Sequence, residues 1–222
     1  MMVSIDSDLH SYYSARAPEY DNVHLKPERQ ADLRAIEQWL PPIFAGADVL
    51  EVACGTGYWT QFIAPVASHV LAVDASIETM NIARGRVPKD RVDFVVGDAY
   101  ALPKSAGKFD AAFAGFWFSH VPKPRRVEFL RGLNSMLKSG AKVVLLDNRF
   151  IEGSSSPISE QDVDGNTYQS RKLIDGRTYR VLKNFPSETE LKSSIDGLGA
   201  RPMLTTWDFY WAFTYVAKGS SA

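Results

Sequence analysis

The sequence of 222 residues predicts an α/β fold in which helices cover both faces of a mostly parallel sheet. Apolar runs that suit buried strands alternate with helical patterns over residues 48–147. The first run, residues 49–53, ends in a turn that contains Gly55 and Gly57, and a helical pattern follows over residues 58–64. Right-handed crossovers in such a doubly wound sheet bring the carboxyl ends of the strands to one edge, so we expect the ligand site there.

Length and composition narrow the class of protein. The chain suits one domain with a sizeable core. A formal net charge of -1 excludes an overall basic field of the kind that holds nucleic acid, so a nucleic-acid partner is not expected. We expect no membrane span and no signal peptide. The single cysteine, Cys54, fits a reducing cytoplasm, and the oligomeric state stays open.

The turn after the first run has the features of a nucleotide-binding loop. Glycines without a Cβ let backbone N–H groups approach a ligand, and the following helix N-terminus offers free donors. A second run, residues 69–73, ends in Asp74, where an acid can bind ribose hydroxyls. The NAD fingerprint fits poorly, because its third glycine would fall at Thr60 and an acid, Glu51, lies inside the first strand.

Four of these positions carry a family resemblance. Glu51, Ala53, Gly55 and Gly57 resemble motif I, [D/E]-x-G-x-G-x-G, of class I S-adenosylmethionine (SAM)-dependent methyltransferases, with Ala53 in place of the usual first glycine. The resemblance extends from about residue 48 to residue 218. Within the family, the chain resembles small-molecule methyltransferases of types 11 and 25. It implies SAM as cofactor and a Rossmann-like methyltransferase fold with seven strands and an N-terminal helical lid.

The resemblance also implies which residues contact the cofactor. Asp98 would lie beside the adenine and accept its exocyclic amine, although it can also be a turn aspartate. Glu51 would lie near the methionine end, and aromatics such as Tyr13 and Phe116 can stabilise the sulfonium or pack on the adenine. The expected cofactor-binding residues are Glu51, Ala53, Gly55, Gly57, Asp74, Ala75, Asp98, Ala99, Phe116 and Tyr20.

The leader before the first strand is expected to be helical. Helical patterns cover residues 8–17 and 27–40, and Pro41 stops the second. Its Tyr-Tyr-x-x-Arg-Ala-x-x-Tyr-Asp pattern resembles leaders that fold over the cofactor; alternatively, its aromatics only pack it onto the core. We divide one methyltransferase domain, residues 1–222, into the lid (1–42), the cofactor-binding core (43–147), an inserted loop and hairpin (148–186), and a closing helix and strands (187–218).

The remaining elements follow in order. Ser76 is a good N-cap for a helix that ends at Arg84, and Ser187 with Glu190 predicts a capping box. Asp175 and Gly176 suit a hairpin turn, and this hairpin can cover the substrate pocket or merely extend the sheet edge. Further strands are expected at residues 91–96, 109–118, 142–147, 167–174, 177–183, 202–209 and 211–217, and further helices at residues 124–137 and 187–198.

His120 is the best candidate for a catalytic base, because it follows the fourth strand and imidazole titrates near neutral pH. It can equally line the pocket without taking a proton. In a second candidate set, Asp147 can orient a base or bind a substrate amine, and Arg149 can bind a carboxylate. The expected substrate-lining residues are Tyr12, Tyr13, Trp117, His120, Asn148 and Arg149.

A cysteine nucleophile and a metal site are two further types of site to consider in this sequence. Cys54 can pack beneath the cofactor or act as a nucleophile. No metal is expected, because His10, His24 and His69 have no metal-ligand spacing. The predicted function is therefore SAM-dependent methylation of a small molecule at an oxygen, nitrogen or carbon atom. An aromatic margin that includes Trp207, Tyr210 and Trp211 favours a flat or apolar acceptor. The alternatives are an RNA or protein methyltransferase, an NAD-dependent reductase, or a binding module without turnover.

Overall fold

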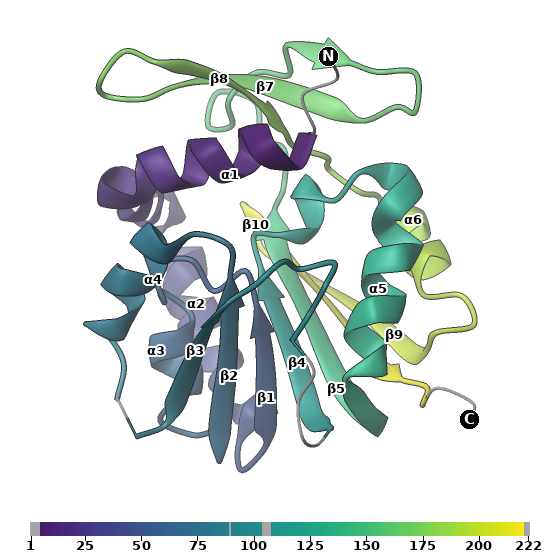
Figure 1. Cartoon of the computed structure of the whole chain (residues 1–222). Helices are drawn as coiled ribbons and strands as arrows, with labels where there is room; N and C mark the ends of the chain where they lie inside the picture. The colour runs from purple at the N-terminus through teal and green to yellow at the C-terminus, as the bar shows by residue number, and fades with distance from the viewer. Residues whose placement is uncertain (1–4, 89, 104–107, 220–222) are drawn as a thin grey trace.

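A seven-stranded sheet forms the centre of the structure, a computed structural model that describes residues 5–88, 90–103 and 108–219 (Figure 1). The strand order is β3-β2-β1-β4-β5-β10-β9, and only β10 runs antiparallel to its neighbours. This confirms the predicted doubly wound, mostly parallel sheet. The strands are β1 (Asp48–Val52), β2 (His69–Asp74), β3 (Val92–Val96), β4 (Phe109–Gly115), β5 (Leu137–Asn148), β9 (Gly199–Thr206) and β10 (Tyr210–Ala217).

The central strands are buried on both faces, because their successive side chains enter two different cores. Val49 of β1 belongs to one apolar cluster, and Leu50 and Val52 belong to the other. On β4, Phe113 likewise belongs to the first cluster and Ala112 to the second. Strands that are buried on both faces need continuous apolar sequences. The apolar runs of the sequence therefore predict these strands.

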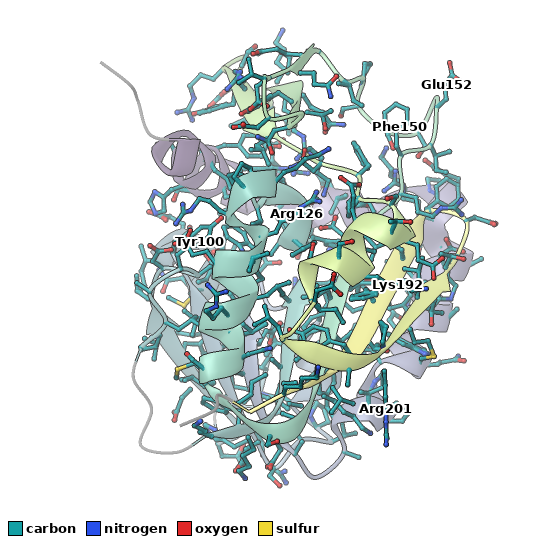
Figure 2. The ribbon with its side chains drawn as sticks, turned by 90° about the vertical axis from the view of Figure 1, so that its right-hand side faces the viewer. Tyr100, Arg126, Phe150, Glu152, Lys192 and Arg201 are labelled. Carbon is teal, nitrogen blue, oxygen red and sulfur yellow. The ribbon has the colours of Figure 1, made fainter. Side chains whose placement is uncertain are left out.

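Helices cover both faces of the sheet. Helices α2, α3 and α4 contribute to the first cluster, and α5 and α6 contribute to the second. Figure 2 shows Arg126 of α5 and Lys192 of α6 on the second face. The helices are α1 (Ile5–Arg16), α2 (Gln30–Trp39), α3 (Thr60–Ile63), α4 (Ile77–Arg84), α5 (Arg126–Ser135) and α6 (Glu188–Ser194). Within the described residues, no helix has the length and apolar character needed to cross a membrane.

The predicted caps are present. The Ser76 side chain accepts a hydrogen bond from the Thr79 backbone at the start of α4, and Ser187 and Glu190 form the capping box of α6. Several boundaries differ from the predictions. Strand β4 ends at Gly115 instead of residue 118, because Phe116 adopts a φ of 59° and a short 3₁₀ turn, Phe118–His120, follows. Strand β5 begins before the predicted residue 142.

The lid and the inserted hairpin lie over the carboxyl ends of the parallel strands. Helix α1 crosses above the sheet, and a three-stranded sheet lies over α1 in turn (Figure 1). Leu9 and Tyr12 of α1 pack with Leu173 and Val181. The hairpin therefore covers α1 and is not an extension of the central sheet. Its strands are β6 (Glu160–Gln161), β7 (Thr167–Lys172) and β8 (Thr178–Leu182). Residues 1–4 of the predicted lid lie outside the described residues.

Candidate active site

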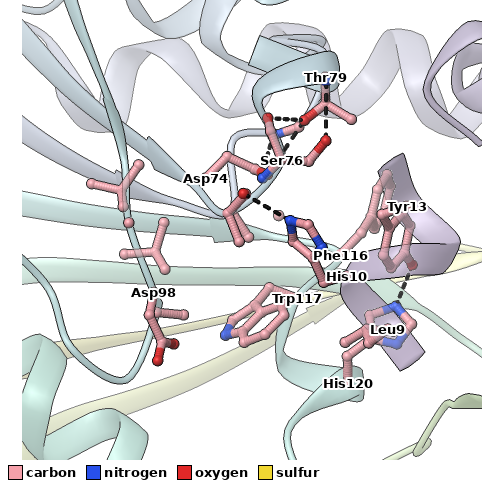
Figure 3. Close-up of a pocket in the computed structure, with 18 of the residues that line it drawn as sticks. Leu9, His10, Tyr13, Asp74, Ser76, Thr79, Asp98, Phe116, Trp117 and His120 are labelled. Atoms are coloured by element: carbon pink, nitrogen blue, oxygen red, sulfur yellow. Dashed lines mark hydrogen bonds between the residues drawn. The ribbon is translucent and has the colours of Figure 1, made fainter. Parts of the chain in front are cut away.

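A first cavity, about 180 Å³ in volume, lies at the carboxyl ends of β1, β2, β3 and β4. Ala53 and Gly55 line it after β1. Asp74 lines it at the end of β2, Asp98 after β3 and Phe116 after β4 (Figure 3). The predicted cofactor residues Tyr20, Ala75 and Ala99 line it as well. The parallel topology thus brings together residues that are far apart in the sequence.

The two glycines of the turn have different roles. Gly55 has a φ of +55°, and a Cβ added to it would meet no atom within 4 Å, so its side-chain position faces open space. A Cβ on Gly57 would lie 2.9 Å from the Ala83 Cβ of α4. Gly57 is not among the described residues that line the first cavity. It therefore serves the close packing of α4 and not a direct ligand contact there.

Asp74 organises the turn from the end of β2. Its Oδ2 accepts a hydrogen bond from the Gly55 backbone N–H at 2.8 Å, and its Oδ1 accepts from the Ser76 N–H at 2.8 Å. Burial raises the pKa of the Asp74 carboxyl, and these backbone bonds partly offset the rise. Oδ1 also accepts from the Thr79 hydroxyl at 3.3 Å, so Oδ2 is the oxygen that keeps a further lone pair for a ligand hydroxyl.

The lid is attached to this cavity by polar contacts. The His10 Nε2 donates to the Ala75 carbonyl at 3.0 Å, as Figure 3 shows, and Ser14 donates to Ser76 at 3.2 Å. After α1, Asp21 accepts from the Thr56 hydroxyl at 2.6 Å and also pairs with Arg86. The leader therefore closes over the first cavity as well as packing on the core.

A second cavity, about 370 Å³ in volume, lies between the lid, the segment after β5 and the hairpin. It meets the first cavity at four side chains that line both: Tyr13, Tyr20, Phe116 and His120. The predicted substrate-lining residues Tyr12 and Asn148 line this second cavity, whereas Trp117 lines only the first. A reaction between two ligands would take place at the shared boundary.

His120 lies at this boundary and is only 3% exposed. Its Nδ1 is 2.5 Å from the Leu182 carbonyl, and its Nε2 is 2.7 Å from the Tyr13 hydroxyl (Figure 3). A carbonyl can only accept, so the proton belongs on Nδ1 and the Nε2 lone pair accepts from Tyr13. Burial, followed by the charges of Lys183 and Arg171, holds the pKa of His120 well below 6.5.

Comparison with known proteins now identifies the family. Residues 49–140 match the family described as "Methyltransferase domain". The Demethylmenaquinone methyltransferase of Staphylococcus saprophyticus is 30% identical over 204 residues, which are 81% of this chain and 85% of that protein. A structure titled "DhpI-SAH complex structure" is 30% identical, with a TM-score of 0.78 over 97% of both chains. The chain belongs to the class I SAM-dependent methyltransferases.

Some other matches are shorter, and one is of nearly full length. The Demethylmenaquinone methyltransferase of Clavibacter sepedonicus is 36% identical over 104 residues, which are 46% of this methyltransferase and 42% of that protein. The chain thus spans about two fifths of the first such relatives. The solved DhpI has also been described in a "DhpI-SAM-HEP complex", which matches with a TM-score of 0.79 over 97% of this chain.

A third, small cavity lies next to the first and shares Tyr20, Ala53, Gly115 and Phe116 with it. Glu51, Tyr58 and Trp59 line it together with Ala53 and Phe116. Glu51 is 1% exposed, and within the described residues its Oε2 has no hydrogen-bond partner. Burial raises the pKa of Glu51 to about 8. A buried carboxyl oxygen without a partner, next to the first cavity, fits the predicted amino group of SAM.

Two candidates from the sequence are corrected in the structure. Asp147 is fully buried, and its carboxylate accepts from Lys183 Nζ at 2.7 Å and from the Ser119 N–H at 3.0 Å, so it orients the turn before His120 and is not available to a substrate amine. Arg149 donates to the carbonyls of Trp207 and Asp208 and lines neither large cavity in the described structure.

The thiol of Cys54 is buried, and burial raises its pKa well above 9.0. A thiol with a raised pKa is a poor nucleophile, which favours the packing role over the catalytic one. Within residues 5–88, 90–103 and 108–219, no group of three or more His, Cys, Asp or Glu side chains could hold a metal ion.

The sequence did not reveal the cations of the second cavity. Arg29 and Lys26 come from the lid, and Arg171 comes from β7. Nothing in the local pattern of these residues distinguishes them from surface cations. Only the position of the hairpin above the lid brings them to one cavity.

Replacing Asp74 should weaken SAM binding. In Asp74→Asn the charge is lost, and we expect a loss of about 1.5–3 kcal/mol of binding free energy, the range for hydrogen bonds to charged groups. Calorimetric titration with SAM measures it. Asp110→Asn is the matched control, because Asp110 lies near the start of β4, at the opposite end of the sheet. Wild-type affinity in a folded Asp74→Asn variant would contradict the role of Asp74.

Glu51 should lose a proton when SAM binds. Its pKa of about 8 means that the ligand-free protein holds this proton at pH 7, and an adjacent ammonium group would favour the charged carboxylate. Titration at pH 7 in buffers with different ionisation enthalpies should show proton release. Glu51→Gln should abolish that release and lower SAM affinity by about 10-fold or more, whereas Glu188→Gln on the surface should change neither. Equal release in wild type and Glu51→Gln would contradict the assignment.

The same pKa sets a stability test. The unfolded Glu51 ionises near 4.5 and the folded one near 8, so the native state binds more protons between these values. The free energy of unfolding of the ligand-free protein should therefore fall as the pH rises through this window. Glu51→Gln should remove that part of the pH dependence. Denaturant unfolding at several pH values measures it, and an identical pH dependence in both proteins would contradict the raised pKa.

Proposed function

We propose that this methyltransferase transfers the methyl group of SAM to a small molecule bound in the second cavity. The observation that carries the proposal is that two cavities of different character meet at Tyr13, Tyr20, Phe116 and His120. The first has the glycine turn and acids suited to SAM, and the second is lined by the lid, the segment after β5 and the hairpin. The names of the relatives, which designate quinone-pathway methyltransferases, also support a small acceptor.

Bound SAM would supply a methyl group already activated by its sulfonium. The chain must align an acceptor with that group and exclude water. The lid and the hairpin cover the boundary, and aromatic side chains line it, which serves the exclusion of water. Transfer would leave the electron pair of the S–CH3 bond on sulfur, and an electron pair of the acceptor would form the new bond to the methyl group.

An acceptor that carries a proton must also lose it. The Tyr13 hydroxyl already donates to the Nε2 of His120. A proton from the acceptor can therefore pass to the Tyr13 oxygen while the Tyr13 proton passes to Nε2, which yields an imidazolium and an unchanged tyrosine. This arrangement supports His120 as the base, with Tyr13 as the group that contacts the acceptor.

The volume of the second cavity, about 370 Å³, supports a small molecule over the alternative of RNA or protein. We propose a cytoplasmic location as well, which the unpaired Cys54 thiol supports. Two measurements test the proposed function. Titration should show SAM binding and no NADH binding, and a screen of small acceptors should release S-adenosylhomocysteine. NADH binding without SAM binding would overturn it.

A further inference from the structure

The second cavity has a strongly one-sided charge. Six cations line it, and Glu19 is the single acidic residue among its lining residues. Lys183 is neutralised by Asp147, which lies 2.7 Å away. The remaining cations come from the lid and from β7 of the hairpin: Arg16, Lys26, Arg29, Arg171 and Lys172.

Three of these remaining cations donate hydrogen bonds to neutral groups. Arg29 is 4% exposed and donates to the Asn148 side-chain oxygen at 2.9 Å and to the Ser154 hydroxyl at 3.0 Å. Lys26 donates to the Ser154 carbonyl at 2.7 Å, and Arg171 donates to the Gln169 side chain at 2.7 Å. Among the described residues, none of these three cations lies within 4.0 Å of a carboxylate oxygen.

A fourth cation of the second cavity, Arg16, lies over the rings of Tyr12 and Tyr20. Its guanidinium carbon is 5.6 Å and 5.2 Å from their centroids. Tyr20 is one of the residues at the boundary with the first cavity. The Glu28 carboxylate reaches the Ser154 hydroxyl at 2.9 Å, but it is exposed and lines neither large cavity in the described structure. Among the described residues, Arg29 and Arg171 therefore have no carboxylate within 4.0 Å, and Glu19 is the one acid that lines the cavity with the five cations.

A buried guanidinium without a counter-ion is costly, because its charge is removed from water without compensation. The cost is recovered when a ligand supplies the opposite charge. Guanidinium groups suit planar or tetrahedral oxyanions, to which they donate two parallel hydrogen bonds. We infer that the methyl acceptor is a small acid whose oxyanion, of the carboxylate or phosphate type, is bound by Arg29 and Arg171 with the neighbouring lid cations. This inference rests on the proposed function, which places the acceptor in the second cavity.

Simple oxyanions provide the test, because the acceptor itself is not needed. Inorganic phosphate and acetate are titrated separately into the protein saturated with S-adenosylhomocysteine, at constant ionic strength, with acetamide as the neutral counterpart of acetate. We expect at least one oxyanion to bind with a Kd of about 1 mM or tighter and acetamide not to bind. The better of phosphate and acetate identifies which type of oxyanion the cavity takes.

Variants connect that binding to the cations. Arg29→Met and Arg171→Met should each weaken oxyanion binding by about 10-fold or more. Arg177→Met is the matched control in the same hairpin, because Arg177 is exposed and pairs with Asp175, and it should bind as the wild type does. Arg16→Met replaces either variant if that variant does not fold, as judged by its thermal unfolding.

Two results would overturn the inference. One is that neither oxyanion binds the loaded protein at concentrations up to about 100 mM. The other is that folded Arg29→Met and Arg171→Met bind oxyanions as tightly as Arg177→Met. Failure of the proposed function gives a different result, because S-adenosylhomocysteine itself would then not bind. A SAM-dependent acceptor screen that pairs acids with their amides should likewise yield products from the acids.

Discussion

Gly55→Val is expected to abolish SAM binding while the chain still folds. A Cβ at this position meets no protein atom within 4 Å, so the protein itself would accommodate the side chain. The space it would enter belongs to the first cavity, which Gly55 lines. We expect SAM affinity to fall by more than about 100-fold, measured by titration calorimetry, because the branched side chain would occupy the space of the cofactor.

Gly46→Val is the matched control for this variant. Gly46 also has a positive φ, +71°, and open space at its Cβ position, but it precedes β1 at the other end of the sheet. Both valines therefore suffer the same kind of backbone strain, about 1–2 kcal/mol. Gly46→Val should bind SAM normally. Normal SAM binding by Gly55→Val would show that the turn after β1 is not the cofactor site.

His120→Ala should lower turnover by about 10²–10⁴-fold, the usual contribution of a general base. SAM affinity should change little, because both ring nitrogens bind protein groups, the Tyr13 hydroxyl and the Leu182 carbonyl, and so have no hydrogen bond to offer the cofactor. His69→Ala is the control, since His69 begins β2 and pairs with Asp93 away from both cavities. A histidine that only lines the pocket would instead raise KM and leave turnover nearly intact.

The pH dependence of turnover provides a second measure of His120. The pKa of this imidazole lies well below 6.5, so the ring is neutral and able to accept a proton throughout the neutral range. Protonation of His120 should therefore cause no change in turnover between about pH 6.5 and 8. Turnover should fall only in more acidic solution, where the ring gains a proton. A fall centred near pH 6.5 that disappears in a folded His120 variant would show that the ring has an ordinary pKa.

The sequence was sufficient to predict the fold and many of the residues that line the first cavity. The apolar runs of β1 and β2 are local signals, and the ends of parallel strands must meet at one edge. Asp74, Asp98 and Phe116 could therefore be placed together before their distances were known. The capping box at Ser187 was also a local pattern, and the structure confirms it.

The second cavity could not be predicted in the same way. Arg29 and Arg171 are separated by most of the chain, and they approach one cavity only because the hairpin packs over the lid. The aromatic residues Tyr210 and Trp211, which indicated an apolar acceptor, are instead buried in the two cores. Their alternation along β10 is the ordinary pattern of a strand covered on both faces.

The low pKa of His120 was also beyond the sequence. It follows from complete burial next to Lys183 and Arg171, neither of which is near His120 in the chain. The Arg149 guanidinium likewise could not be oriented in advance, because its partners are the carbonyls between β9 and β10. Such properties depend on tertiary contacts between distant segments.

A crystal structure of the protein with S-adenosylhomocysteine tests the account most directly. We expect the ribose hydroxyls at Asp74, the amino group at Glu51, and the sulfur in contact with at least one of the four boundary residues Tyr13, Tyr20, Phe116 and His120. The sulfur would then face the cationic second cavity. A ligand bound outside the first cavity, or one whose sulfur is separated from the second cavity by protein, would contradict the two-cavity arrangement on which the proposed methyl transfer depends.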